Sequence, residues 1–316
     1  MPVLALLTLL VAGVAAAATH PGDAVAMRSL ANTTGAARTL QWGASSPDPC
    51  GGTWVGVTCN GERRVTAINA SRGGLTGHLG GVGTLWHPLP APLSMLTSLS
   101  ELDLSFNALR DDLPVLPRLL GGLHVLDLRS NSFAITNGFF AAFPALETFN
   151  LDGNEMSTLK PWIPYDVTSC PGLRSFSAAN VHFAGGFPNY FGNATLFPEL
   201  ESLSLARNLL WGETTPEFGK SSKIRFLDVS QQGHDEDARP DDVMQGGLSF
   251  VSGMANLVEA HLEGNVFKGP LPDATSLANL RVFDASDNDL CGVAKFPAGV
   301  TVNVAGNPGV GTPCPS

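Results

Sequence analysis

His261 lies two residues from a glutamate on either side, Glu259 and Glu263. Alternate side chains of a strand point to the same face, so these three side chains share one face. An imidazole between two carboxylates is suited to general acid–base catalysis, but that chemistry needs a pocket around the reacting atoms, and the surface of an open sheet offers none. The sequence also lacks the spacings of zinc-protease, nucleophile-elbow and P-loop motifs. We therefore expect a protein that is not an enzyme and needs no cofactor.

An acidic stretch is the one candidate for metal binding. It runs from His234 to Asp237 and continues with Asp241 and Asp242. Carboxylate oxygens are ligands that Ca²⁺ prefers, but a run of like charges more often forms a solvated loop. We therefore predict no metal site.

A short repeated strand must position these residues. Leu99 to Asn107 reads LSELDLSFN, with leucine at places 1, 4 and 6 and asparagine at place 9. This is the leucine-rich-repeat signature: the leucines point inward, the asparagine bonds the backbone at the bend, and neighbouring turns stack to bury a shared core. Ten turns are expected, and they start at Val65, Leu99, Leu123, Leu146, Leu173, Leu200, Ile224, Leu257, Leu280 and, in degenerate form, Gly299.

The spacing of the turns sets the predicted domains. Two spacings are too long and place inserts near 80–96 and 231–247, and asparagine is replaced at place 9 by Gly73, Val181 and Gln232. Segments such as Leu75-Thr-Gly77 mark the plant-type repeat. The predicted fold is an α/β leucine-rich-repeat solenoid, curved, with parallel strands on its concave face. The predicted domains are a signal peptide at 1–18, an N-terminal cap at 19–62, repeats at 63–307 and a tail at 308–316.

Places 2, 3, 5, 7 and 8 of each turn are expected on the concave surface or its edge. They hold many carboxylates and arginines but no lysine in the turns that start at 65 to 280. Arginine suits bidentate recognition of a partner's carboxylate or phosphate; alternatively, these charges pair with one another and keep the face soluble. The candidate binding residues are Glu101, Asp103, Phe106, Arg129, Asp152, Arg174, Arg207, Arg225, His261 and Glu263.

The first eighteen residues form an apolar run that ends in alanines, as a secretory signal peptide does. The run is short of the roughly 20 residues that a membrane span needs, so we expect no span and a protein secreted to the apoplast. A net charge of −10 argues against nucleic acid as a partner. Three sequons are candidate glycosylation sites, at Asn32, Asn69 and Asn193.

Five cysteines fit an oxidising compartment. Pairing Cys50 with Cys59 would close a short loop in the cap, which is worth about 2–3 kcal/mol in the chain-entropy account. Cys291 and Cys314 can staple the far end, although the sequence does not fix that pairing. Cys170 precedes a turn and is expected to be a free, buried thiol.

Several phrases carry a family resemblance: SSPDPCGGTWVGVTC, LRSFSAANVHFAGGFPNYFG and FPELESLSLARNLLWGETTPEF. They resemble the ectodomains of plant leucine-rich-repeat receptor-like kinases, in particular the first repeat block of the TMK (transmembrane kinase) subfamily. The resemblance implies a cell-surface module that binds an extracellular protein or peptide ligand, or a membrane co-receptor kinase. The family pattern continues through a second repeat block and a membrane helix into a kinase, whereas this chain stops at Ser316. We expect a binding module without its own kinase.

A second family fits the same class of secreted solenoid. Polygalacturonase-inhibiting proteins are similar in size, and membership would make the chain an inhibitor of a cell-wall enzyme. That resemblance implies a more regular 24-residue spacing and more cap cysteines than this chain has. It is the alternative to the receptor-like function.

Overall fold

A computed structural model describes residues 18–80, 92–154, 161–233 and 243–315. Most of the predicted signal peptide and the central part of each predicted insert lie outside the described residues. The acidic stretch considered for metal binding, 234–242, lies outside them as well.

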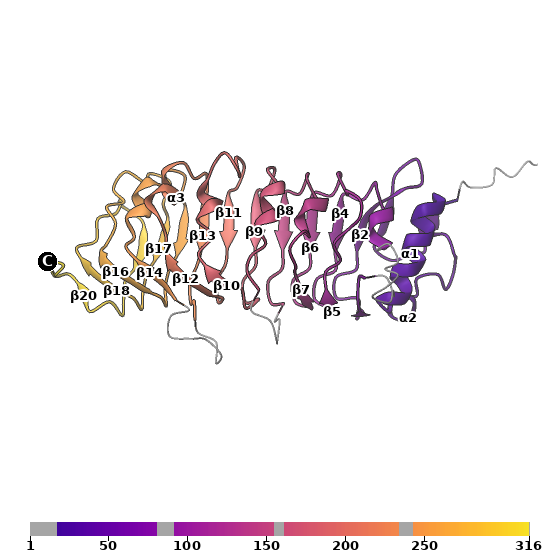
Figure 1. Cartoon of the computed structure of the whole chain (residues 1–316), viewed down its shortest axis with the longest axis horizontal. Coiled ribbons are helices and arrows are strands. Elements are labelled where there is room, and N and C mark those ends of the chain that lie inside the picture. The colour runs from indigo at the N-terminus through magenta and orange to yellow at the C-terminus, as the bar shows by residue number, and fades with distance from the viewer. Residues whose placement is uncertain (1–17, 81–91, 155–160, 234–242, 316) are drawn as a thin grey trace, which may run out of the picture.

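One long sheet runs the length of the described molecule (Figure 1). Each turn adds one strand in register, and every pairing is parallel except the antiparallel pair β1–β2 at the N-terminal end. The predicted solenoid with parallel strands is confirmed. In spatial order the strands are β1 (Val57–Cys59), β2 (Val65–Asn69), β4 (Glu101–Asp103), β6 (Val125–Asp127), β8 (Thr148–Asn150), β9 (Ser175–Ser177), β11 (Ser202–Ser204), β13 (Phe226–Asp228), β15 (Glu259–His261), β17 (Val282–Asp284) and β19 (Thr301–Asn303).

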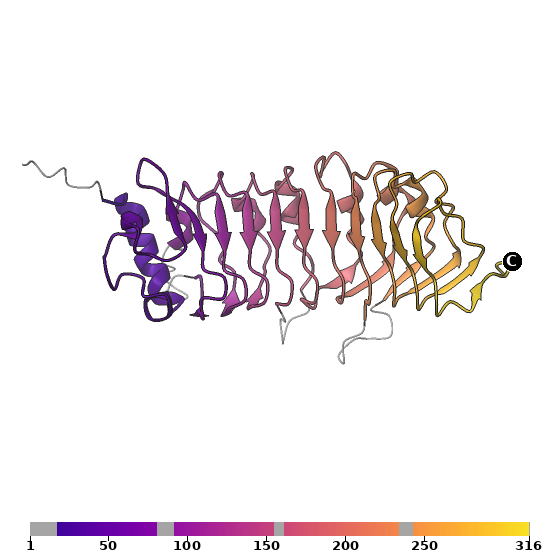
Figure 2. The ribbon, with the colours of Figure 1, turned by 180° about the vertical axis from the view of Figure 1, so that it is seen from behind.

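Other strands form two further sheets along one edge of the solenoid (Figures 1 and 2). They follow place 9 of their turns, where the apolar-x-glycine segments lie. The first sheet contains β3 (Thr76–Gly77), β5 (Ala108–Asp112) and β7 (Ser132–Ala134). The second contains β10 (Ala184–Gly186), β12 (Leu209–Glu213), β14 (Met244–Gly246), β16 (Val266–Pro270), β18 (Asp289–Gly292) and β20 (Gly309–Val310).

Helices cover the N-terminal end and the back of the turns (Figure 2). Helix α1 (Pro21–Thr33) and helix α2 (Ala36–Thr39) close the N-terminal end, and α3 (Pro216–Lys220) lies in a later turn. The remaining helical segments are short 3-10 turns: η1 (Pro49–Gly51), η2 (Pro92–Met95), η3 (Phe140–Ala142), η4 (Tyr165–Ser169), η5 (Asn189–Gly192) and η6 (Ser249–Gly253).

A ladder of buried amides joins successive turns. The Asn131 side chain donates to the carbonyls of Leu104 (2.9 Å) and Leu128 (3.0 Å) and accepts from the Leu109 amide (3.0 Å). Gln232, which replaces asparagine at place 9, continues this ladder. Its longer side chain donates to the Leu205 carbonyl at 2.8 Å and accepts from the Leu210 amide at 3.1 Å.

The core is a column of leucine and phenylalanine side chains beneath the main sheet. Leucines at places 1, 4 and 6 are buried in turn after turn. Between them the rings of Phe149 and Phe176 lie 5.4 Å apart and those of Phe176 and Phe191 lie 5.0 Å apart. Burial of such rings is the main source of stability in a fold whose turns contact only their neighbours.

The N-terminal cap is fastened to the first turn by polar contacts. Asp23 lies inside α1 and is fully buried, while His20 occupies the N-cap position. The Asp23 carboxylate accepts from the Arg64 guanidinium at 2.8 Å and from the Val65 amide at 2.8 Å. This pair ties α1 to β2.

The cap also contains the predicted disulfide, Cys50–Cys59. Trp42 and Trp54 stack beside it with ring centroids 5.4 Å apart. Asp48 accepts from the Thr19 amide at 3.0 Å, and its bonds to Thr19 hold the pKa of this carboxyl below its usual value. At the opposite end of the chain, Cys291 is bonded to Cys314.

The Cys170 thiol should be unreactive in the folded protein. Its side chain is fully buried, burial raises its pKa to about 12, and the thiol donates to the Phe143 carbonyl at 3.3 Å. Because the thiolate is the reactive form, we expect no reaction with Ellman's reagent at pH 8 within an hour. In denaturant without reductant, one thiol per chain should react, because the other four cysteines are paired. A fast reaction in the native protein would contradict this burial.

Candidate binding face

The exposed surface of the main sheet, here called the strand face, carries most of the predicted binding residues. Its side chains line up in rows because the strands pair in register. Place 5 forms one such row, in which Asn69 lies beside Asp103, Asp103 beside Asp127, and His261 between Asp228 and Asp284. Polar residues from turns distant in sequence therefore form continuous lines across the surface.

Near the N-terminal end of the strand face lies the Phe106 cluster, formed by Arg72, Phe106 and Arg129. Phe106 is 40% exposed, and the guanidinium carbons of Arg72 and Arg129 lie 4.4 and 5.5 Å from its ring centre. Arg129 also pairs with Asp127 at 2.8 Å, and burial raises the pKa of the Asp127 carboxyl. The cluster offers an apolar ring held between two cations.

A row of alternating charge follows at place 2 of the central turns. Arg174 lies 3.9 Å from Glu147 and 3.7 Å from Glu201, and Arg225 lies 3.6 Å from Glu201. These side chains are about half exposed, so each pair contributes at most about 1 kcal/mol to stability. This row matches the alternative in which charges of the face pair with one another.

His261 and its two glutamates lie near the C-terminal end of the strand face. His261 is 3.7 Å from Glu259 and 4.0 Å from Glu263, which are distances of electrostatic contact and too long for hydrogen bonds. Burial raises the pKa of Glu263, and the nearby Asp284 raises it further. The Phe226 ring lies 5.7 Å from the imidazole. The group forms an acidic patch on an open surface.

The other predicted residues differ in how freely they can meet a partner. Asp152 accepts from the Ser177 hydroxyl and the Ala179 amide, both at 2.7 Å, and Asp103 accepts from the Ser105 hydroxyl at 2.6 Å. Asp152 therefore holds residues of the next turn, whereas Asp103 holds a residue of its own turn. Glu101 and Arg207 are exposed, and no carboxylate among the described residues pairs with Arg207.

Place 8 has an unusual backbone in all ten turns. The residue there has a φ between 53° and 71°, the left-handed region that favours glycine. Three turns have glycine at this place, but Phe106 (φ 55°) and Arg207 (φ 55°) adopt the same conformation with large side chains. Sequence periodicity gave no sign of this constraint, because the residue types at place 8 vary widely.

The three sequon asparagines, Asn32, Asn69 and Asn193, are all exposed. Asn69 ends β2 and lies beside Asp103 on the strand face, so a glycan there would cover the N-terminal part of that face. Glycosylation of these sites stays a prediction.

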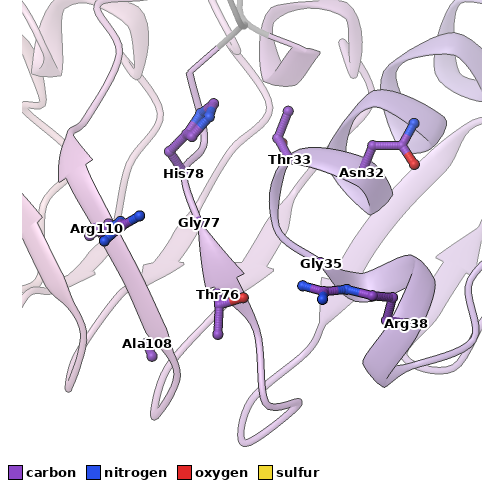
Figure 3. A pocket seen from close by; sticks show the side chains of 9 residues that line it. All are labelled: Asn32, Thr33, Gly35, Arg38, Thr76, Gly77, His78, Ala108 and Arg110. Carbon is purple, nitrogen blue, oxygen red and sulfur yellow. The ribbon is translucent and has the colours of Figure 1, made fainter.

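Sequence reasoning missed a pocket between the cap and the first turns (Figure 3). Arg38, His78 and Arg110 line it together with threonine and glycine residues. Arg38 lies on α2, His78 directly follows the edge strand β3, and Arg110 lies on β5, all outside the places that the repeat assigns to the strand face. Only the folded contact between the cap and the first turns brings them together.

Comparison with known proteins shows which proteins this chain is similar to. The family described as "Leucine rich repeat N-terminal domain" matches residues 20–60. The chain is 30% identical to the receptor-like kinase TMK2 of Arabidopsis thaliana over 251 residues, which are 79% of this chain and 26% of that protein. It is 29% identical over 242 residues to the receptor-like kinase TMK4 of the same plant, covering 76% of this chain and 23% of that protein.

Among solved structures, the ectodomain of the Arabidopsis receptor kinase HAESA, in complex with a peptide hormone ligand, superimposes with a TM-score of 0.62. The identity is 25%, and the match covers 88% of this chain and 47% of that one. The chain thus has the fold and the N-terminal domain of the leucine-rich-repeat ectodomains of plant receptor-like kinases, as its motifs predicted. Within that class its sequence is similar to the TMK kinases, of whose length it spans about a quarter.

The predicted extracellular location is confirmed, because the similar receptor ectodomains are extracellular. Across the described residues, no helix is both long and apolar enough to cross a bilayer.

Proposed function

We propose that the chain is an extracellular binding module that recognises a protein or peptide through the strand face, without catalysis of its own. Its similarity to receptor ectodomains supports this function, and the HAESA ectodomain was solved with a peptide hormone ligand. A membrane co-receptor kinase is a second kind of partner that fits the class. The net charge of −10 disfavours nucleic acid.

The Phe106 cluster is the observation that carries this proposal. Aromatic and arginine side chains dominate the binding energy of protein interfaces, and here one exposed ring lies between two guanidinium groups. Holding Phe106 in the left-handed region costs about 1–2 kcal/mol. A side chain that costs folding free energy and leaves its ring exposed contributes more to a contact surface than to stability.

The test compares partner capture by matched variants. The chain, produced in a secretory host and immobilised, is incubated with apoplastic wash fluid, and retained proteins and peptides are quantified by mass spectrometry. Phe106→Ala and Arg129→Ala should each lose the partner that the unchanged chain retains. With that partner purified, Kd should rise at least about tenfold, which corresponds to the roughly 1.4 kcal/mol or more that an interface hot spot contributes.

Val266→Ala is the matched control, because Val266 is 43% exposed on β16, away from the strand face. It should retain the partner at unchanged affinity. Equal retention by Phe106→Ala, Arg129→Ala and Val266→Ala would contradict the strand face as the recognition surface. Inhibition of a pectin-degrading enzyme would instead support the inhibitor alternative.

A further inference from the structure

The pocket between the cap and the first turns is large enough to hold a small molecule. Its volume is about 670 Å³, within the range of roughly 300–1,000 Å³ for ligand pockets. The end of α1, the turn into α2, and the edge strands β3 and β5 form its wall (Figure 3). It lies apart from the Phe106 cluster, and none of its lining residues belongs to that cluster.

Close backbone packing between β3 and the end of α1 forms this wall. Thr76 and His78 donate their amides to the carbonyls of Thr34 (2.9 Å) and Thr33 (3.1 Å), which joins β3 to the end of α1. Between them, Gly77 has a φ of 114°, and a Cβ at this position would lie 2.1 Å from the Thr33 carbonyl oxygen. The close approach therefore requires glycine, and side chains from the cap and from β5 meet around it.

The pocket is cationic in an acidic protein. Arg38 reaches from α2 toward Thr76, and Arg110 lies on the neighbouring strand β5 (Figure 3). Within the described parts of the chain, no carboxylate lies within 4 Å of either guanidinium, although Arg63, Arg64, Arg129, Arg174 and Arg225 all have such a partner. Asp111 and Asp112 follow Arg110 on β5 but do not line the pocket. Two guanidinium groups without a carboxylate partner, on one pocket, suit an anionic ligand.

The remaining lining groups suit hydroxyls. Thr33, Thr76 and Asn32, whose side chains carry hydroxyl and amide groups, line the pocket. His78 donates from Nδ1 to the Gly80 carbonyl at 2.8 Å, since a carbonyl can only accept, and this leaves Nε2 of the neutral ring as an acceptor. A ligand with one carboxylate and several hydroxyls matches this combination of donors and acceptors.

We propose that this pocket, here called the cap pocket, binds an acidic saccharide. Arg38 and Arg110 hold the uronate carboxylate, and Thr33, Thr76 and His78 hydrogen-bond the ring hydroxyls. The site would give the chain a second ligand class beside the partner of the strand face.

Calorimetric titration with digalacturonate at low ionic strength tests the proposal. The chain carries Asn32→Gln, which keeps an amide in the wall but removes a glycan that would stand at the rim of the pocket. Arg38→Gln and Arg110→Gln should each weaken binding at least about tenfold, the loss expected for a charge-assisted hydrogen bond. Arg118→Gln is the matched control, because it removes the same charge. Arg118 is exposed and does not line the pocket. The affinity of this variant should be unchanged.

Two further probes separate an acidic saccharide from a simple anion. The neutral disaccharide digalactose should bind at least tenfold more weakly than digalacturonate, and so should sodium acetate. Equal affinity for acetate and digalacturonate would overturn the assignment in favour of a plain carboxylate site. The cap pocket is not the site if Arg38→Gln, Arg110→Gln and Arg118→Gln bind digalacturonate with equal affinity. Absence of digalacturonate binding at millimolar concentration would also overturn it. Phe106→Ala should leave this titration unchanged, so failure here leaves the strand-face proposal standing.

Discussion

Replacing Asp23 with alanine should lower the free energy of unfolding by about 3–5 kcal/mol, the cost of leaving a buried charge without its partner. The Asp23 side chain is fully buried, whereas its partner Arg64 is 18% exposed. Removal of the Asp23 carboxylate also leaves the Val65 amide without its acceptor. Because this contact joins α1 to β2, the cap should open before the repeats do. Hydrogen exchange of 21–33, followed together with urea unfolding, measures both effects.

Two variants separate the buried charge from the packing around it. The double change Asp23→Leu with Arg64→Met should recover most of the lost stability, because apolar residues of similar volume often replace a buried pair without loss. Asp48→Ala breaks a pair of similar length, Arg63–Asp48 at 2.6 Å, in which both side chains are about a quarter exposed. Its loss should be smaller. If Asp48→Ala costs as much as Asp23→Ala, burial does not decide the strength of these pairs.

Replacing Asn208 with alanine should lower the free energy of unfolding by about 3–5 kcal/mol. The Asn208 side chain is 1% exposed. It donates to the carbonyls of Ala178 (2.8 Å) and Leu205 (2.9 Å) and accepts from the Phe183 amide (2.9 Å). Alanine leaves the Ala178 carbonyl and the Phe183 amide without this partner, at about 1–3 kcal/mol each, whereas the Leu205 carbonyl keeps its bond from the Gln232 side chain. Urea unfolding followed by circular dichroism and by tryptophan fluorescence measures the change and tests whether the turns unfold together.

Asn279→Ala is the control for this experiment, because Asn279 is exposed and makes one long bond, 3.3 Å, to the Ala255 carbonyl. It should change stability by less than about 0.5 kcal/mol. Asn208→Gln should recover part of the loss, since Gln232 shows that a longer amide can occupy place 9. Equal stability of the two alanine variants would show that the ladder does not join the turns.

The sequence predicts the repeat well because each turn repeats the same local pattern. Leucine at fixed places and asparagine at place 9 determine strand, bend and stacking at once, so the strands begin close to where the pattern put them. The roles of Asp23 and Gln232 could not be predicted, for one shared reason. The partners of Asp23 lie 41 and 42 residues away in sequence, and the fit of the longer Gln232 side chain depends on the spacing between stacked turns.

For the candidate sites too, the local pattern could be predicted and the contacts between distant residues could not. Period-two alternation placed Phe106 and Arg129 on the strand face, but the cation–π contact with Arg72 depends on the distance between turns, which the pattern does not give. The cap pocket could not be predicted, because Arg38 and Arg110 lie 72 residues apart and line one pocket only after the cap packs on β3.

The left-handed backbone at place 8 sets how this surface can change. On neighbouring rows a substitution alters contacts alone, but at place 8 any residue other than glycine also carries a backbone cost of about 1–2 kcal/mol. Replacing Phe106 or Arg207 with glycine would therefore remove contact surface and, at the same time, remove this backbone cost from the free energy of folding. Each large side chain in this row is therefore displayed at a cost to the free energy of folding.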